Sequence, residues 1–190
     1  MEKYLASSEI IDFHNPKVKV LAEKLAKDCV SDEQIVKNCF EYVRDEIKHI
    51  GDYPSDTKAC TASEVLEKRI GICYAKAHLL AALTRANNIP TAFSYQRLSC
   101  SEYEKGMMCI HGLNAVYLKN HGWYRIDARG NREGVDAQFT PPFEKLAFPL
   151  QEGEIDIEGY FEEPLTCIVE HLNKYDKHKD ILGKLPDSID

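Results

Sequence analysis

The chain of 190 residues lacks an excess of positive charge. Its 24 Lys and Arg residues stand against 31 Asp and Glu residues, so the net charge is 24 − 31 = −7. Sequence-independent binding to nucleic acid requires a clustered basic face, and no basic run compensates locally. Nucleic acid is therefore excluded from the expected partners.

Long apolar segments are also missing. The first twenty residues carry charges throughout and contain no apolar stretch of the kind that forms a secretory signal. The longest uncharged apolar run extends from Leu79 to Leu83, which is far too short to cross a bilayer. We therefore expect no membrane partner and a cytoplasmic location.

Cysteine is frequent but lacks a pattern. The seven cysteines are an odd number, their spacing is irregular, and no C-x-x-C pair occurs. A fully paired disulfide scaffold would leave one cysteine over, and structural zinc sites need ligand pairs at short spacing. The sequence thus predicts reduced cysteines, in keeping with the cytosol, and neither a metal nor a cofactor.

The first half of the chain has helical periodicity. Asn15-Pro16 predicts a helix start, Ser31 with Gln34 predicts a capping box for a helix to about Lys48, and Thr61 with Glu64 predicts another. A further apolar helix is expected from Cys73 to the Asn87-Asn88 pair, where Pro90 enforces the stop.

Strand composition follows in residues 91–98 and twice within 106–130, and a final charged helix is expected after Pro164. Helices first and strands second indicate an α+β domain with N-terminal helices packed on an antiparallel β-sheet. A chain of this length suits one domain, here 1–190, with enough residues to bury its own core.

Three residues form a pattern that carries chemistry: Cys73 at a predicted helix N-terminus, His111 on a predicted strand, and Asp127 on the next strand. The N–H groups of a helix N-terminus and an imidazolium stabilise a thiolate, and a carboxylate orients the imidazole. Taken alone, Cys73 would more often be a buried packing residue, His111 a structural histidine and Asp127 a partner of a nearby arginine.

Strand register constrains this triad. If His111 and Asp127 lie opposite each other on antiparallel strands, the connection must centre near Lys119. A tight turn at His121-Gly122 would instead place Asp127 opposite Val116, about 16 Å along the strand from His111. The triad therefore predicts a wider loop around 118–121 or a bulge, for which Gly122 is suited.

In the order and spacing of these residues the chain resembles the transglutaminase-like superfamily. The segment IGICYAKAHLLAALTRANNIPTAF is similar to the family's nucleophile segment, and HGLNAVYLKNHGWYRIDARGN is similar to its histidine and aspartate strands. The resemblance covers about Val36 to Phe139. It departs from the family after the histidine, at Gly112-Leu113, and after the aspartate, where Ala128 begins the segment Ala-Arg-Gly.

The resemblance implies a papain-like fold in which about 36–139 form the core and 140–190 a C-terminal flap and helix. It implies Cys73 as the nucleophile, His111 as base and later acid, and Asp127 as the orienting group. A thiol hydrolase or acyltransferase acting on amide or peptide bonds through a thioester is then expected, with hydrolysis favoured over transfer. The substrate would be a peptide, a protein or a small amide.

Three further residues are candidates for substrate contact, each with an ordinary alternative. Tyr74 could line a pocket or lie in the core, Trp123 could wall the site or pack on the sheet, and Arg129 could bind a carboxylate or be a solvated loop residue. Two other functions stay open: a binding or assembly module with a vestigial triad, and a metal site on Cys73 and His111, which lacks nearby additional ligands.

Overall fold

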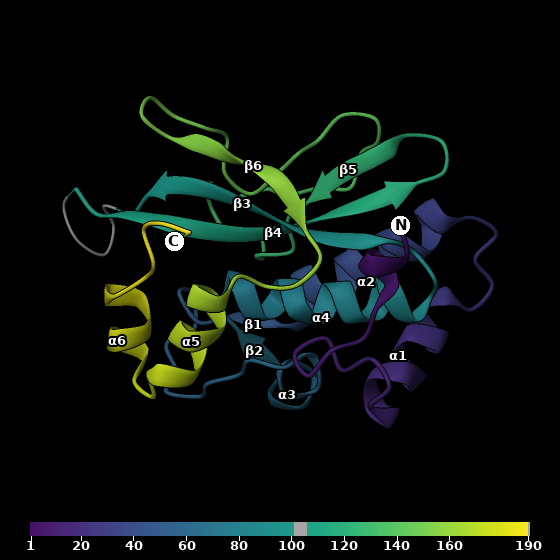
Figure 1. Ribbon diagram of the computed structural model, residues 1–190, viewed down its shortest axis with the longest axis horizontal. Helices are drawn as coiled ribbons and strands as arrows, with labels where there is room; N and C mark the ends of the chain where they lie inside the picture. Colours follow the sequence, from purple (N-terminus) through teal and green to yellow (C-terminus); the bar gives the residue numbers. More distant parts are fainter. Residues whose placement is uncertain (101–105, 190) are drawn as a thin grey trace.

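The computed structural model describes residues 1–100 and 106–189. Along the chain the elements are η1 (Glu2–Leu5), α1 (Pro16–Ala26), α2 (Asp32–Glu46), β1 (Lys48–His49), α3 (Ala62–Lys68), β2 (Ile70–Gly71), α4 (Cys73–Ala86), β3 (Thr91–Ser99), β4 (Met108–Leu118), β5 (Gly122–Ile126), β6 (Ile155–Phe161), α5 (Thr166–Lys174) and α6 (His178–Gly183). The helices gather on one side of a four-stranded sheet, with α4 running along it (Figure 1). The expected α+β class, helices against an antiparallel sheet, is confirmed.

Side-chain caps define where the N-terminal helices begin. The Asn15 side chain accepts the N–H of residue 17 at 3.0 Å at the start of α1, and Thr61 with Glu64 forms the predicted capping box of α3. Ser31 accepts the Gln34 N–H at 3.3 Å, but the Gln34 side chain accepts from the residue before Ser31, so this cap is only half of the predicted box. These caps satisfy N–H groups that the first helical turn cannot.

Helix α4 is buried on all sides from its first residue to Arg85. A helix buried all round has no polar face, so its polar side chains need partners inside the protein. His78 is an example: its ring donates to the Cys60 carbonyl at 2.7 Å, and burial lowers its pKa to about 4, in keeping with a structural role. Across residues 1–100 and 106–189, no helix has both the length and the apolar character that a membrane crossing requires.

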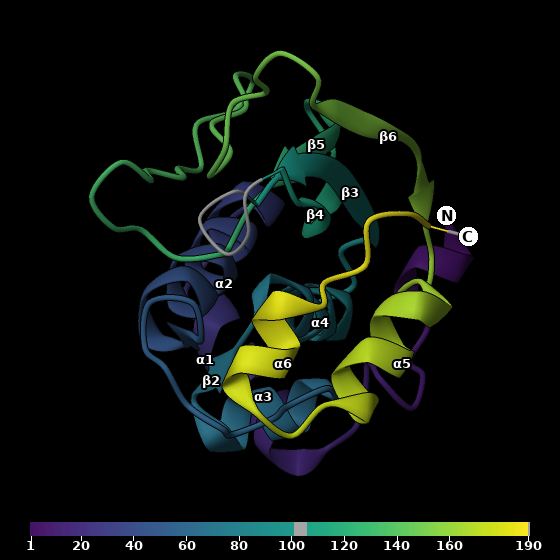
Figure 2. The same cartoon turned by 90° about the vertical axis from the view of Figure 1, so that its left-hand side faces the viewer.

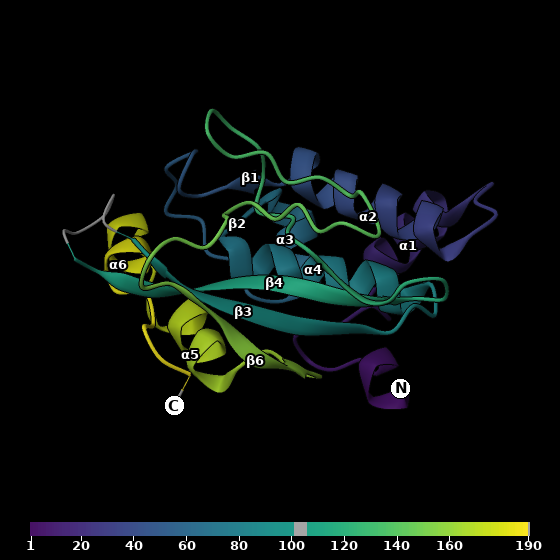
Figure 3. The ribbon, with the colours of Figure 1, turned by 90° about the horizontal axis from the view of Figure 1, so that it is seen from above.

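The sheet has the strand order β5-β4-β3-β6, and every neighbouring pair is antiparallel. Seen from above, β4, β3 and β6 lie side by side with α4 alongside them (Figure 3). Leu118 pairs with Gly122 across a three-residue loop, and Gly122 takes a positive φ of 74°. This is the wider loop that the triad required, rather than a tight turn at His121-Gly122.

The C-terminal part differs from the prediction in two ways. The flap expected within residues 140–190 includes a strand, β6, which forms the edge of the sheet. Every residue of β6 is exposed or half-buried, and the apolar–acidic alternation of Ile155 to Glu158 ends at Gly159, so the strand signal in the sequence is short. The single expected C-terminal helix is two helices, α5 and α6, and Figure 2 shows them (yellow) and the long β5–β6 connection (green) on different sides of α4.

The cysteines are not all reduced. Cys100 and Cys109 form a disulfide at the end of the β3–β4 pair where the chain passes from β3 to β4, leaving five free thiols. Register explains the pairing: Cys109 lies opposite Leu98, and Cys100 follows two residues later, so the two Cα atoms are 6.0 Å apart, within disulfide reach. The expectation of seven reduced cysteines is corrected, so the cysteines no longer support a cytosolic location, which stays a prediction.

Candidate active site

Cys73 is the first residue of α4, and its position follows from the chain that precedes it. Gly71 ends β2, and Ile72 is the N-cap residue, whose side chain makes no capping hydrogen bond. The first N–H groups of α4 are therefore open to a ligand or to a neighbouring side chain. The Cys73 side chain lies at the surface of a cavity although the residue is only 8% exposed.

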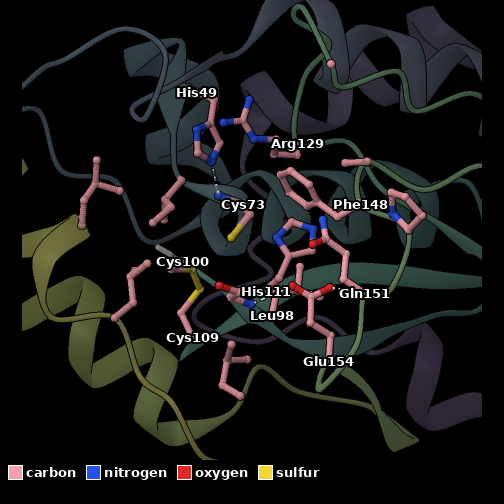
Figure 4. A pocket seen from close by; sticks show the side chains of 18 of the residues that line it. His49, Cys73, Leu98, Cys100, Cys109, His111, Arg129, Phe148, Gln151 and Glu154 are labelled. Carbon is pink, nitrogen blue, oxygen red and sulfur yellow. Dashed lines mark hydrogen bonds between the residues drawn. A yellow bond between two sulfur atoms is a disulfide. The ribbon is translucent and has the colours of Figure 1, made fainter. Parts of the chain in front are cut away.

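His111 and Asp127 meet because of the β4–β5 register. Asn114 pairs with Ile126, so Asp127 continues β5 about two residues along from His111 on the same side of the sheet. The His111 Nε2 atom is 2.8 Å from an Asp127 carboxylate oxygen. The Cys73 sulfur points toward the same imidazole (Figure 4), and the Cys73 side chain helps to raise the pKa of His111.

The backbone orients the Asp127 carboxylate. One oxygen accepts the Arg129 N–H and the other accepts the Ala147 N–H, both at 3.1 Å, while the residue is 1% exposed. Burial alone would raise the pKa of Asp127, but the His111 charge and these hydrogen bonds outweigh it, so the pKa lies below its usual value. Asp127 is therefore a fixed anion behind the imidazole.

The charge of His111 follows from its two neighbours. Burial disfavours the imidazolium, yet Asp127 and Cys73 together raise the pKa of His111 to about 10. The Phe148 ring packs edge-on against the imidazole, with centroids 5.2 Å apart, and covers its outer side. A protonated, oriented imidazole beside a thiol is the arrangement that activates a cysteine nucleophile.

A close contact between α4 and β4 holds the two halves of the site together. Gly112 follows His111, Tyr74 follows Cys73, and the Tyr74 ring lies so near that a Cβ built on Gly112 would be 2.7 Å from its Cδ1. The Tyr74 hydroxyl donates to the Ile110 carbonyl, which anchors the ring over the strand. Glycine at 112 thus lets the helix approach the strand where the nucleophile and the base must meet.

The cavity in front of Cys73 has a volume of about 420 Å³. Leu98, Ile110, Leu182 and Leu185 supply apolar surface, and the Cys100–Cys109 disulfide lies on the same wall. Phe148 and Pro149 belong to the β5–β6 connection, so part of the expected C-terminal flap does line the cavity.

The three residues predicted to contact substrate have different positions. Arg129 lines the cavity, but it is buried and its guanidinium pairs with both oxygens of Asp52. Tyr74 is buried against β4, and the Trp123 ring packs against the rings of Tyr4, Tyr117 and Tyr160. Neither residue lines the cavity. The structure assigns packing contacts to these two aromatic residues.

His49 is part of the site although no sequence pattern singled it out. It lies on β1, whose parallel pairing with β2 sets His49 beside Gly71, two residues before Cys73. The Cys73 N–H donates to the His49 Nε2 atom at 3.1 Å. A strand of two residues carries no periodicity, so the only available signal was a histidine directly after the predicted second helix. Within residues 1–100 and 106–189, no three His, Cys, Asp or Glu side chains are grouped so that they could hold a metal ion.

Comparison of the sequence with models of protein families identifies the family of this chain. The family model of the transglutaminase-like superfamily matches residues 19–128, more than half of the chain. The chain belongs to the transglutaminase-like superfamily. A search of curated proteins finds no match.

Two solved structures are similar to this chain. A candidate cysteine protease from Cytophaga hutchinsonii is 23% identical with a TM-score of 0.52, over 66% of this chain and 40% of that one. The periplasmic domain of TgpA from Pseudomonas aeruginosa is 18% identical with a TM-score of 0.49, over 66% of this chain and 45% of that one. This chain therefore spans less than half the length of these neighbours. The predicted transglutaminase-like, papain-like fold is confirmed.

Proposed function

We propose that this protein is a thiol-dependent enzyme that cleaves amide or peptide bonds through a Cys73-His111-Asp127 triad, with hydrolysis favoured over transfer. The observation that carries the proposal is the connected set of groups at one cavity: the thiol beside His111, and His111 2.8 Å from a buried, backbone-anchored Asp127. Family membership supports this chemistry, since cysteine-dependent acyl chemistry occurs in the superfamily.

The reaction would proceed in two stages. The Cys73 thiolate attacks the carbonyl carbon, a C–S bond forms, and the negative charge moves to the carbonyl oxygen near the Cys73 N–H. When the C–N bond breaks, His111 transfers its proton to the departing amine, which leaves a thioester on Cys73. His111, now neutral, removes a proton from water, whose attack releases the acid and regenerates the thiol. An amine in place of water would give transfer.

The cavity favours an extended acyl group with apolar side chains. Leu98, Ile110, Leu182 and Leu185 give the cavity apolar lining, and Gln151 and Glu154 give it polar lining. A volume of about 420 Å³ matches a ligand of a few residues or a small amide. Peptides with apolar residues are therefore the substrates to test first.

The test is acylation of Cys73 by an activated ester, p-nitrophenyl acetate, followed by peptide mass spectrometry. We expect an acetyl adduct on Cys73 that decays with turnover. Cys73→Ala should abolish it, and Cys60→Ala, which removes a buried thiol whose pKa burial raises to about 11, should not. Peptide amides with a fluorogenic leaving group then test amide cleavage, and an added primary amine tests transfer.

A protein that forms no Cys73 adduct, and that turns over substrate no faster than Cys73→Ala, is not this enzyme. That result would support the alternative of a binding or assembly module on the same fold.

A further inference from the structure

Glu154 lies on the face of the sheet that carries His111. Gln96 pairs with His111 on one side and with Asp156 on the other, so these three side chains share a face. Glu154 comes two residues before Asp156 and returns to that face, because side chains alternate along a strand. It is therefore about 7 Å along the sheet from His111 and two strand spacings of about 4.8 Å across it.

The Glu154 carboxylate belongs to the wall of the cavity in front of Cys73. The residue is half-buried and lines this cavity, and its side chain is directed toward His111 (Figure 4). The Ser99 N–H donates to one carboxylate oxygen and the Gln151 N–H donates to the other, both at 2.8 Å. These bonds hold the carboxylate in place before a substrate arrives. A carboxylate has about four acceptor sites, so about two are left for a ligand.

The negative charge of Glu154 differs from the other charges of the cavity wall in its lack of a counter-ion. The two arginines of the wall, Arg129 and Arg132, both pair with Asp52. Within residues 1–100 and 106–189, no lysine, arginine or histidine forms an ion pair with Glu154. A carboxylate without a cation is costly once a substrate displaces the water around it. A substrate that carries a positive charge to this point removes that cost.

On the basis of the proposed function, we propose that Glu154 is a specificity-determining residue that binds an ammonium group of the substrate. An ammonium group supplies N–H donors together with the missing positive charge. A neutral substrate of the same shape strips water from the carboxylate and returns no charge, so the same residue disfavours it. The ammonium belongs to a lysine side chain or to a free N-terminus, which present the same chemistry. The apolar lining, Leu98 included, receives the carbon chain that leads to it.

The first experiment alkylates Cys73 in the full chain with two reagents of equal length. N-(4-aminobutyl)bromoacetamide and N-pentylbromoacetamide both lose bromide to the thiol. Only the first ends in an ammonium group, about 9 Å from the reacting carbon when extended. The ratio of their rates at Cys73, read by peptide mass spectrometry, measures the preference for positive charge. Glu154→Gln should lower this ratio by about fivefold, the upper end for a partly exposed ion pair.

Three further variants separate the charge of Glu154 from its place in the loop. Glu152→Gln is the matched control and should leave the ratio unchanged, because Glu152 is exposed and does not line the cavity. Gln151→Glu adds a carboxylate to the cavity wall and should raise the ratio, and Glu154→Lys should lower it below that of Glu154→Gln. A loosened loop changes both alkylation rates of one variant and therefore cancels in their ratio.

Peptide amides with a fluorogenic leaving group then identify the source of the ammonium. If Glu154→Gln lowers the preference for lysine over norleucine, the lysine side chain binds at Glu154. If it lowers the preference for a free over an acetylated N-terminus, the terminal ammonium binds there. Turnover in which neither preference depends on Glu154 would overturn the assignment.

The assignment and the proposed function can fail separately. An alkylation ratio that is unchanged in Glu154→Gln, or that falls equally in Glu152→Gln, would overturn the assignment while Cys73 still turns over substrate. A wild-type protein that is alkylated at Cys73 but never acylated by an ester or a peptide amide would remove the proposed function, and with it the role of Glu154 in substrate choice.

Discussion

Gly112→Ala tests how tightly the site depends on the contact between α4 and β4. The added Cβ would lie 2.7 Å from the Tyr74 Cδ1 atom, about 0.7 Å short of ordinary contact at 3.4 Å, and 3.5 Å from the Tyr74 Cα atom. The Tyr74 ring cannot turn away freely, because it is 1% exposed and its hydroxyl is held by the Ile110 carbonyl. Helix and strand must therefore separate locally.

Two effects of known size follow from that separation. Overpacking of this kind costs about 1–3 kcal/mol in the free energy of unfolding. Cys73 and His111 are the residues next to the clashing pair, so the nucleophile and the base move apart by a similar fraction of an ångström. A misplacement of about 1 Å can slow a reaction by about 10²-fold. We expect acetylation of Cys73 to slow by about ten- to a hundredfold.

Urea unfolding and the acetylation rate measure the two effects separately. Gly183→Ala is the matched control, because nothing lies within 4 Å of a Cβ built there, and it should leave acetylation unchanged. In the double variant Gly112→Ala/Tyr74→Ala the destabilisation should be less than the sum of the two single changes, since the clash is removed. Wild-type stability and acetylation in Gly112→Ala would refute this account of the glycine.

Three further outcomes are expected. Burial lowers the pKa of Lys76 to about 7, whereas an unfolded lysine keeps its proton up to about pH 10.4. Between these pH values the unfolded state therefore binds more protons than the folded state. The free energy of unfolding of the wild type should then rise with pH, relative to that of Lys76→Met, by up to about 1.4 kcal/mol per pH unit. Urea unfolding at pH 7 and pH 9 measures this, and a difference that stays constant or shrinks would contradict it. Dithiothreitol should lower the free energy of unfolding by about 2–3 kcal/mol, because it reduces the disulfide that closes the Cys100–Cys109 loop. It should have no effect on the double variant Cys100→Ser/Cys109→Ser. Titration of seven rather than five thiols in unfolded, unreduced protein would disprove the disulfide. Asp127→Asn removes the charge that raises the pKa of His111 and should slow the acetylation of Cys73 by about 10³–10⁴-fold. The circular dichroism spectrum should not change. A variant that keeps more than a tenth of the wild-type acetylation rate would show that Asp127 does not orient the base.

The triad could be predicted from the sequence because its three residues lie in segments whose helix or strand pattern is clear. Cys73 follows a glycine at the start of an apolar helix, and His111 and Asp127 lie on adjacent strands joined by a short loop. The sequence could state only which β4–β5 register would bring His111 and Asp127 together, and not whether the strands adopt it. The observed pairing of Leu118 with Gly122 centres the loop on Asn120, one residue beyond Lys119. Asp127 therefore lies two residues along the strand from the position opposite His111, and the two side chains bridge that offset at 2.8 Å.

Other features could not be read from the sequence for physical reasons. His49 reaches Cys73 through a pairing of two-residue strands, and such pairing has no periodic signal. The edge strand β6 has only four residues of apolar–acidic alternation, Ile155 to Glu158, before Gly159 interrupts the pattern. The Cys100–Cys109 disulfide depends on the β3–β4 register rather than on cysteine spacing. In each case the deciding contact is made between segments distant in sequence or weakly patterned.

Alkylation of Cys73 by iodoacetamide between pH 6 and pH 9, followed by peptide mass spectrometry in the wild type and in His111→Ala, tests the central claim most directly. The account predicts that Cys73 reacts far faster at pH 6 than the other four free cysteines, and that this advantage disappears without His111. A Cys73 that reacts no faster than the others, or whose rate rises only toward pH ~8.5 as for an ordinary thiol and is unchanged in His111→Ala, would contradict it.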